Sequence, residues 1–369
     1  MTLPERWTET LQEWRRKGRY RELTPGRGID FASNDYLGYA RSERRGSSSP
    51  LAAHSGMASR LVHDEPVWEQ VEAKLATWHG TEAALIFPSG YVANEGLLST
   101  LMEPQDWVAS DQLNHASIID GLRLSKAERF IFRHQDLNHL EDGLRTAARN
   151  SAANRQLFIV TESLFGMDGD RTPLAEMLDL AGRYKAHLIV DEAHATGCFG
   201  ANGCGRVEPA WRERIPATVH TGGKALAVPG AYVCGSQLLR DLLVNRCRHF
   251  IFTTAMAAAI GGWWLEMLEH VTGDEVKRAA LHRNANLFRA ELSRHRIEAG
   301  GNDYIVPIIL GDDARTMQAA RKLQAKGLDI RGIRPPSVPA GTARLRVSIH
   351  AVHDESTLRF AAAEIARVV

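Results

Sequence analysis

The sequence is poor in cysteine and carries no excess of charge of either sign. Its 369 residues include four cysteines, which form no CxxC pair and no spacing with histidine that is typical of a metal site. Lysine and arginine number 45 against 44 acidic residues, so the basic surface that nucleic acid or an anionic membrane requires is missing. We therefore expect reduced thiols, no bound metal, a cytoplasmic location and a small-molecule substrate.

Long apolar runs are also missing. No run reaches the roughly 18 apolar residues of a membrane-spanning helix, and residues 1–20 are amphipathic and charged. We expect neither secretion nor membrane insertion. The chain shows no internal repeat, and its length exceeds that of one ordinary domain, which favours two packed units with ample buried core.

What the sequence does contain, from about residue 80 onward, is an alternation of short apolar runs with helical stretches. "AALIF", "QLFIV" and "HLIVD" are typical of buried strands. Strand–helix alternation predicts the α/β class, with a mostly parallel central sheet flanked by helices and a smaller C-terminal α+β domain. We predict an N-terminal helix and segment over 1–40, a large domain over 41–255, and a small domain with a connecting helix over 256–369.

Polar residues follow these predicted strands. Open α/β sheets bind ligands at the carboxyl ends of their strands. One shared cleft is therefore expected to contain Ser89, Asp111, Glu162, Asp191 and Lys224.

The letters "DEAH" at residues 191–194 favour an alternative, a helicase-type ATPase. Such an enzyme also needs a GxxxxGK[ST] loop whose backbone N–H groups and lysine bind phosphate. No such loop is present, and "HTGGKA" lacks both its first glycine and the hydroxyl after the lysine. The ATPase is thus a remote alternative.

Lys224 has no acidic neighbour for more than ten positions on either side and stands among small and apolar residues. Either its stem covers apolar surface or its amine does chemistry. Desolvation would lower the pKa of that amine and make it nucleophilic. Paired with Asp191, it would supply the two groups that pyridoxal phosphate requires, a Schiff-base lysine and a carboxylate for the pyridine nitrogen.

At this point the chain resembles the α-oxoamine synthase family of fold type I pyridoxal-phosphate enzymes over nearly its whole length. The motifs follow one another in the order and spacing of the family. They are "FASNDYLGY" (31–39), "FPSGYVANEGLL" (87–98), "LNHASIIDG" (113–121), "TESLFGMDGDRTPL" (161–174), "VDEAHATGCFG" (190–200), "HTGGKAL" (220–226) and "RPPSVPAGTARLRVSIHAVH" (334–353).

The resemblance implies the roles of the cofactor residues. His115 stacks on the cofactor ring, Asp191 pairs with the ring nitrogen, His194 hydrogen-bonds the phenolic oxygen, and Lys224 carries the Schiff base. The family also implies a homodimer in which Thr253 and Thr254 reach the phosphate of the partner subunit. The further residues expected to hold the cofactor are Ser89, Gly90, Tyr91, Glu162 and Thr221.

The resemblance also implies a reaction, the condensation of an amino acid with an acyl thioester and loss of CO₂. Arg344 is expected to bind the amino-acid carboxylate with help from Asn34, since a guanidinium binds a carboxylate through two hydrogen bonds. Ser59 and the C-terminal motif favour L-alanine with pimeloyl-CoA or a pimeloyl acyl-carrier-protein thioester, the step used in biotin synthesis. Arg21 could meet the distal acyl carboxylate, or could lie on a solvated basic helix end.

Two features depart from that pattern. The turn "HSGMAS" (54–59) resembles the glycine-using branch of the family, so glycine with acetyl-CoA is the alternative substrate pair. Gly166 stands where many members have serine. We expect a polar contact near the cofactor or thioester to be missing there or to be supplied by water.

Overall fold

The computed structural model describes residues 3–20, 28–40, 58–149 and 155–369. The chain divides into two compact units. Unit 1 contains residues 1–36, 167–170 and 279–369, and unit 2 contains residues 37–166 and 171–278. The predicted three-part division at residues 40 and 255 stays a prediction. In the two-unit division, the connecting helix α9 (Ala258–Gly273) belongs to unit 2.

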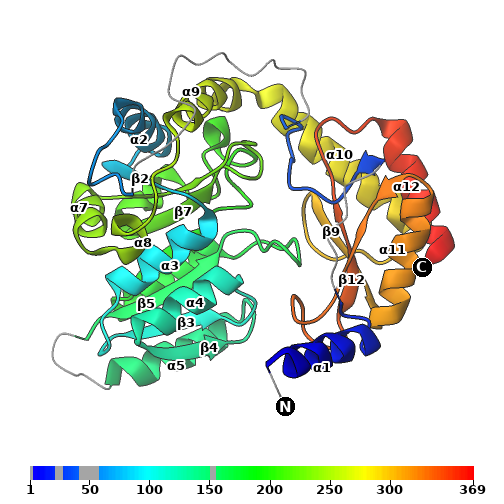
Figure 1. The fold of residues 1–369 in the computed structure, drawn as a ribbon, viewed down its shortest axis with the longest axis horizontal. Coiled ribbons are helices and arrows are strands. Elements are labelled where there is room, and N and C mark those ends of the chain that lie inside the picture. The colour runs from blue at the N-terminus through cyan, green and yellow to red at the C-terminus, as the bar shows by residue number, and fades with distance from the viewer. Residues whose placement is uncertain (1–2, 21–27, 41–57, 150–154) are drawn as a thin grey trace. The chain divides into compact units, whose positions relative to one another are not determined.

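A seven-stranded sheet forms the centre of unit 2 (Figure 1). Its strand order is β2-β8-β7-β6-β5-β3-β4, and β8 alone runs antiparallel to its neighbours. The predicted mostly parallel α/β sheet is thereby confirmed. The strands are β2 (Ala83–Phe87), β3 (Trp107–Asp111), β4 (Glu128–Phe132), β5 (Leu157–Glu162), β6 (His187–Asp191), β7 (Ala217–Thr221) and β8 (Ala231–Gly235).

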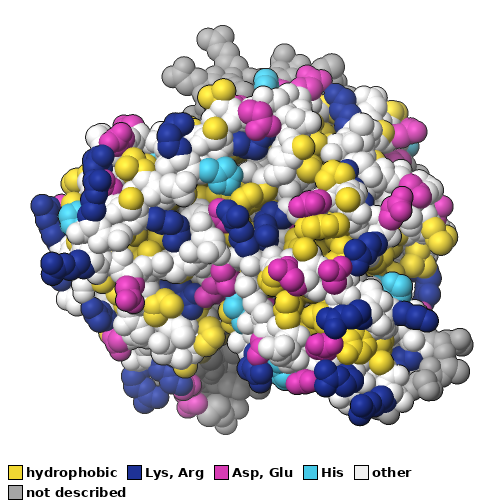
Figure 2. Space-filling view, turned by 180° about the vertical axis from the view of Figure 1, so that it is seen from behind, with side chains coloured by type: hydrophobic (Ala, Val, Ile, Leu, Met, Phe, Trp, Pro, Cys, Tyr) yellow, Lys and Arg dark blue, Asp and Glu magenta, His cyan; other side chains and the backbone are white. Residues whose placement is uncertain are grey.

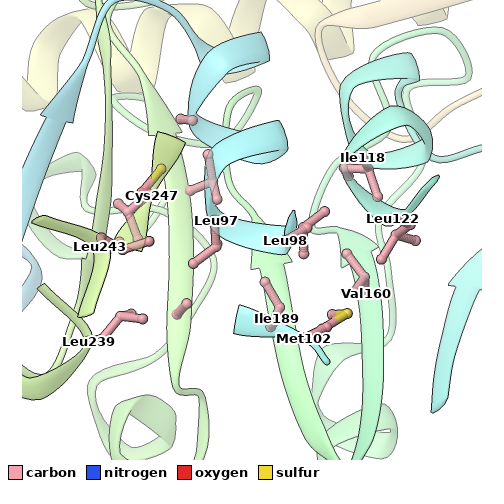
Figure 3. Close-up of a cluster of buried hydrophobic side chains, with 14 of the residues drawn as sticks. Leu97, Leu98, Met102, Ile118, Leu122, Val160, Ile189, Leu239, Leu243 and Cys247 are labelled. Carbon is pink, nitrogen blue, oxygen red and sulfur yellow. The ribbon is translucent and has the colours of Figure 1, made fainter. Parts of the chain in front are cut away.

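Helices cover both faces of this sheet because successive strand residues point to opposite sides. Val160 and Ile189 point into one apolar cluster, which Figure 3 shows packed against α3 and α4. Their neighbours Ile159 and Val190 point into a second cluster, against α5 and α6. The helices of unit 2 are α2 (Pro66–His79), α3 (Gly90–Leu101), α4 (Ala116–Ser125), α5 (Leu137–Arg149), α6 (Leu174–Tyr184), η1 (Ala201–Gly203), η2 (Pro209–Arg214), α7 (Gln237–Arg246), α8 (Arg248–Ile251) and α9.

Unit 1 contains both helices and strands, and it includes the N-terminal residues as well as residues 279–369. Its antiparallel sheet has the order β11-β12-β9, and a parallel pair joins β1 to β10. Backbone hydrogen bonds from Ser348 N to Phe31 O (2.8 Å) and from Ala351 N to Tyr36 O (2.7 Å) attach the N-terminal segment. The elements are α1 (Leu3–Arg16), β1 (Ile29–Asp30), β9 (Ile305–Gly311), α11 (Asp313–Ala325), β10 (Leu328–Asp329), β11 (Arg331–Ile333), β12 (Ala343–Ser348) and α12 (Glu355–Val368), with α10 (Glu275–Arg294) starting in unit 2 and continuing here.

The surface matches the balanced composition. On the face shown in Figure 2, basic and acidic side chains are interspersed. Among the described helices, none combines the length and the apolar character needed to cross a membrane. All four cysteines are buried free thiols, as expected.

Candidate active site

The predicted polar residues of unit 2 meet at the carboxyl edge of its sheet. Glu162 and Asp191 end neighbouring parallel strands and lie opposite each other in the register of β5 and β6. Asp111 ends β3 and Thr221 ends β7. Because parallel strands all present their carboxyl ends at one edge, sequence positions far apart are brought together here.

Asp191 is a buried carboxylate with a fixed orientation. The Nδ2 group of Asn94 donates a hydrogen bond to Asp191 Oδ2 (2.7 Å), and the backbone N–H of Ala193 donates to Oδ1 (2.8 Å). Only 6% of Asp191 is exposed. Two donors on a buried carboxylate hold it in place, as is required of a group that must keep a heterocyclic nitrogen protonated.

A short hydrogen-bond chain connects Asp191 to His115. The second Nδ2 hydrogen of Asn94 is donated to Ser117 Oγ (3.0 Å), which lies 2.8 Å from His115 Nδ1. His115 caps α4, because its Nδ1 also accepts from Ser117 N (3.2 Å). With Nδ1 acting as acceptor, the proton of the neutral ring is on Nε2. Burial lowers the pKa of His115, Asp191 opposes that shift, and the charge of Lys224 adds to it.

Glu162 provides the electrostatic contrast to Asp191. Its Oε1 accepts a hydrogen bond from the backbone N–H of His115 (2.7 Å). Burial, followed by repulsion from Asp191, raises the pKa of Glu162 to about 8, and Lys224 partly offsets that rise. Of these two neighbouring carboxyl groups, Glu162 therefore holds a proton at neutral pH. Two buried acids with different surroundings are common in active sites.

Lys224 lies three residues beyond the end of β7 and is half-buried. Its charge lowers the pKa of both Glu162 and His115, so the amine lies within electrostatic range of these two groups. The next two residues, Ala225 and Leu226, are buried and fix the chain after the lysine. The structure thus brings Lys224 to the cluster that the sequence predicted.

The start of α3 presents hydrogen-bond donors that suit an anion. Ser89 caps this helix by accepting from Val92 N (3.3 Å), and the N-terminal N–H groups of the helix carry partial positive charge. A Cβ added to Gly90 would lie 3.7 Å from Thr221 Oγ1, so the helix start and that hydroxyl are neighbours. Tyr91 packs edge-on to His115, with ring centroids 6.1 Å apart. These residues fit the phosphate end of pyridoxal phosphate.

Other predicted residues lie elsewhere. Thr253 and Thr254 line a small cavity with Arg60, Pro88 and His249, among other residues. Ser59 is buried in a turn, where its Oγ accepts from Leu61 N (3.2 Å). Arg21 and residues 54–57 of the turn "HSGMAS" lie outside the described residues.

Asn34 and Arg344 both belong to unit 1, but they have different hydrogen-bond partners. Arg344 Nη1 lies 2.5 Å from Asp168 Oδ1. Asn34 Oδ1 instead accepts from Arg346 Nη2 (2.9 Å) and from Tyr36 Oη (3.0 Å). Residues two apart on a strand share a face. Both arginines of the motif "ARLR" are therefore candidates for binding the amino-acid carboxylate.

Sequence reasoning missed Asn94, Ser117 and Arg346. Asn94 lies one helical turn after Gly90, and this spacing could have indicated that both face the sheet edge. Ser117 could have been found from its place two residues after the capping His115. Arg346 could have been found from its place two residues after Arg344.

A lysine, an oriented buried carboxylate, a neutral histidine and a helix start with free N-terminal donors next to a threonine hydroxyl fit pyridoxal phosphate. With the sheet order, they define the class of fold type I pyridoxal-phosphate enzymes.

The chain belongs to the aminotransferase class I and II family, whose pattern it matches over residues 27–365. It is 42% identical to 8-amino-7-oxononanoate synthase of Anaeromyxobacter dehalogenans, with 92% of this chain and 86% of the other aligned. It is 40% identical to the protein of the same name from Chlorobaculum parvum, with 91% and 88% aligned.

Solved structures agree. Serine palmitoyltransferase from S. paucimobilis with bound PLP and myriocin has a TM-score of 0.88 at 25% identity, covering 100% of this chain and 98% of that one. The 8-amino-7-oxononanoate synthase of Francisella tularensis has a TM-score of 0.77 at 27% identity, covering 92% and 97%. The chain is a pyridoxal-phosphate-dependent acyltransferase of the α-oxoamine synthase group, and the ATPase alternative is discarded.

Proposed function

We propose that this enzyme condenses L-alanine with pimeloyl-CoA, or with a pimeloyl acyl-carrier-protein thioester, to give 8-amino-7-oxononanoate, CO₂ and the free thiol. The observation that carries the chemistry is that Lys224 lies within electrostatic range of Glu162, whose neighbour at the sheet edge, Asp191, is held by Asn94. The substrate pair is supported by the names of the relatives at 40 to 42% identity. Glycine with acetyl-CoA is the second candidate, favoured by "GMAS" at residues 56–59.

The residues divide the work as follows. Bound pyridoxal phosphate would supply an electron sink next to the amino-acid Cα. Asp191 would hold the proton on the ring nitrogen, and the start of α3 with Thr221 would bind the phosphate. Lys224 Nζ would hold the cofactor until the amino group of the substrate replaces it, and the freed amine would then accept the Cα proton. His115 would stack against the face of the cofactor ring and so orient it. Its imidazole is held in place by the hydrogen-bond chain through Ser117 and Asn94.

For the amino-acid carboxylate, we place Arg346 ahead of Arg344. Both arginines are buried, Arg344 with 3% and Arg346 with 5% of its surface exposed, but Arg344 is already paired with the carboxylate of Asp168, whereas Arg346 donates to neutral oxygens such as Ser348 Oγ (2.8 Å). Arg346 lies beside Asn34, the other residue predicted for this task. The role of Arg344 stays a prediction, as do the homodimer, the roles of Thr253 and Thr254, and the cytoplasmic location.

Kinetics separate the two arginines. Loss of a charge-paired hydrogen bond typically costs at least about 2 kcal/mol, so Arg346→Ala should raise KM for the amino acid about 30-fold or more. The Arg344→Ala variant should change that KM less. A larger rise in KM for Arg344→Ala than for Arg346→Ala would show that Arg344 binds the amino-acid carboxylate.

The substrate pair is tested by measuring release of the CoA thiol. Glycine, alanine and serine are each combined with acetyl-, succinyl-, pimeloyl- and palmitoyl-CoA, and pimeloyl-acyl-carrier protein is run beside them. Alanine with a pimeloyl thioester should give the highest kcat/KM. One methyl group in a pocket is worth only about 1 to 3 kcal/mol, so glycine can retain some activity. A different best pair would refute the assignment and leave the acyltransferase class intact.

A further inference from the structure

Gly166 lies directly against the imidazole of His194. A Cβ added to Gly166 would be 2.2 Å from His194 Nε2, 2.8 Å from Cε1 and 2.9 Å from Cδ2. These three atoms form the outer edge of the ring. The imidazole therefore occupies the space that any side chain at residue 166 would enter.

Backbone conformation does not explain this glycine. Gly169, Gly197 and Gly200 have φ values of 68°, 86° and 76°, which favour glycine. Gly166 is not among the residues with positive φ. Its special feature is the contact with His194, so the missing Cβ is a matter of space.

The backbone around His194 cannot easily absorb a clash. Thr196 N (2.9 Å) and Thr196 Oγ1 (2.8 Å) both donate to Glu192 O. His220 Nδ1 lies 2.8 Å from the same hydroxyl and connects the turn to β7. On the other side, Ala193 N donates to Asp191. A side chain at 166 would therefore act mainly on the torsion angles of the His194 ring.

We propose that Gly166 is a positioning residue: its missing side chain sets the orientation of the His194 imidazole at the cofactor. The polar group expected near residue 166 is then His194 Nε2 itself, in place of a water molecule or a serine hydroxyl. This inference rests on the proposed pyridoxal-phosphate chemistry and on the predicted hydrogen bond of His194 to the cofactor, but not on the identity of either substrate.

A double-mutant cycle tests the coupling. Gly166→Ala and Gly166→Ser are made alone and combined with His194→Ala. The readouts on cofactor-loaded protein are the pH dependence of its visible absorbance, the Kd for pyridoxal phosphate and kcat for thiol release. Gly273→Ala is the matched control, because a Cβ on Gly273 would meet nothing within 4 Å.

With His194 present, both changes at 166 should move the pH midpoint of the visible absorbance and lower kcat on the order of 10-fold or more, as a misplaced group does. In the His194→Ala background, the same changes should alter kcat and Kd by less than about 2-fold. Gly273→Ala should match the wild type in every readout. Equal effects in the two backgrounds, or an unchanged absorbance midpoint in Gly166→Ser, would overturn the proposal.

Folding failure is also informative. If Gly166→Ala does not fold, Gly166→Ala/His194→Ala should fold and bind the cofactor, because the clash is removed. If neither variant folds, glycine at 166 is required for a reason other than its contact with His194, and the inference is refuted. Because absorbance and cofactor affinity need no substrate, a wrong substrate pair would leave these results interpretable.

Discussion

Asp191 and Glu162 lie side by side at the ends of β6 and β5, yet their surroundings differ. Asp191 receives hydrogen bonds from Asn94 and Ala193. Glu162 is buried with one backbone donor, His115 N, and its pKa is raised to about 8. The two hydrogen-bond donors hold the Asp191 carboxylate in a fixed orientation, which suits a partner for a pyridine nitrogen.

Replacing Asp191 by Asn tests this assignment. The amide keeps the size of the side chain but cannot hold a proton on the ring nitrogen. We expect turnover to fall on the order of 10²-fold or more while the cofactor remains bound. Cofactor binding is read from visible absorbance after desalting, and turnover from thiol release. Turnover close to wild type would give Asp191 a purely structural role.

Glu162 should affect stability in the alkaline range. Its folded-state pKa, about 8, exceeds the ordinary value of 4.5. The folded state therefore keeps a proton that the unfolded state loses, and stability falls as pH rises from 4.5 to 8, by up to about 1.4 kcal/mol per pH unit.

Glu162→Gln should remove this dependence, because the amide oxygen can still accept from His115 N. The free energy of unfolding of the cofactor-free wild type and variant is measured by urea unfolding at pH 5 and pH 8.5. The variant should gain stability over the wild type at the higher pH and much less at the lower. An equal difference at both pH values would contradict the raised pKa.

At the scale of elements, a polar network lies where α2 packs against β7 and β8. Ligand atoms of His79, His220 and Cys234 lie within 4.8 Å of one another. His79 Nε2 lies 2.8 Å from Tyr232 Oη, and the two nitrogens of His220 lie 2.8 Å and 2.7 Å from the hydroxyls of Thr196 and Thr218. We interpret the cluster as a hydrogen-bonded network of neutral groups.

This network should make the protein sensitive to acid. Burial lowers the pKa of His79 to about 3 from 6.5. Between pH 6.5 and pH 3, His79 is protonated in the unfolded state but stays neutral in the folded state. The free energy of unfolding therefore falls as the pH drops toward 3, by up to about 1.4 kcal/mol per pH unit. In His79→Gln, the loss of unfolding free energy between pH 7.5 and pH 5 should be about 2 kcal/mol smaller than in the wild type. Equal losses would refute the shift.

The elements also show which features the sequence could reveal. Apolar runs that end in Asp, Glu or Thr predicted the strands and their shared edge, because burial and direction set both. The direction of β8 could not be predicted, since a short run of five residues has the same pattern either way. The choice between Arg344 and Arg346 depended on long-range partners, Asp168 and Asn34, that no local pattern displays.

At the scale of the whole molecule, distant contacts decide the organisation. Residues 167–170 belong with unit 1 although residues on both sides belong to unit 2. Within unit 1, Asn302 N donates to Gly169 O (2.7 Å), and Asp168 pairs with Arg344. A continuous division of the sequence cannot anticipate such a short insertion, because its cause is pairing between residues far apart in the chain.

The central claim is that Lys224 carries the cofactor at the sheet edge built around Asp191. Borohydride reduces a carbon–nitrogen double bond to a stable secondary amine, so it marks the lysine that holds pyridoxal phosphate. Peptide mass spectrometry of reduced holoprotein should find the pyridoxyl group on Lys224, and Lys224→Ala should show neither label nor visible absorbance. A label on another lysine, or an unlabelled Lys224 in cofactor-loaded protein, would contradict the account.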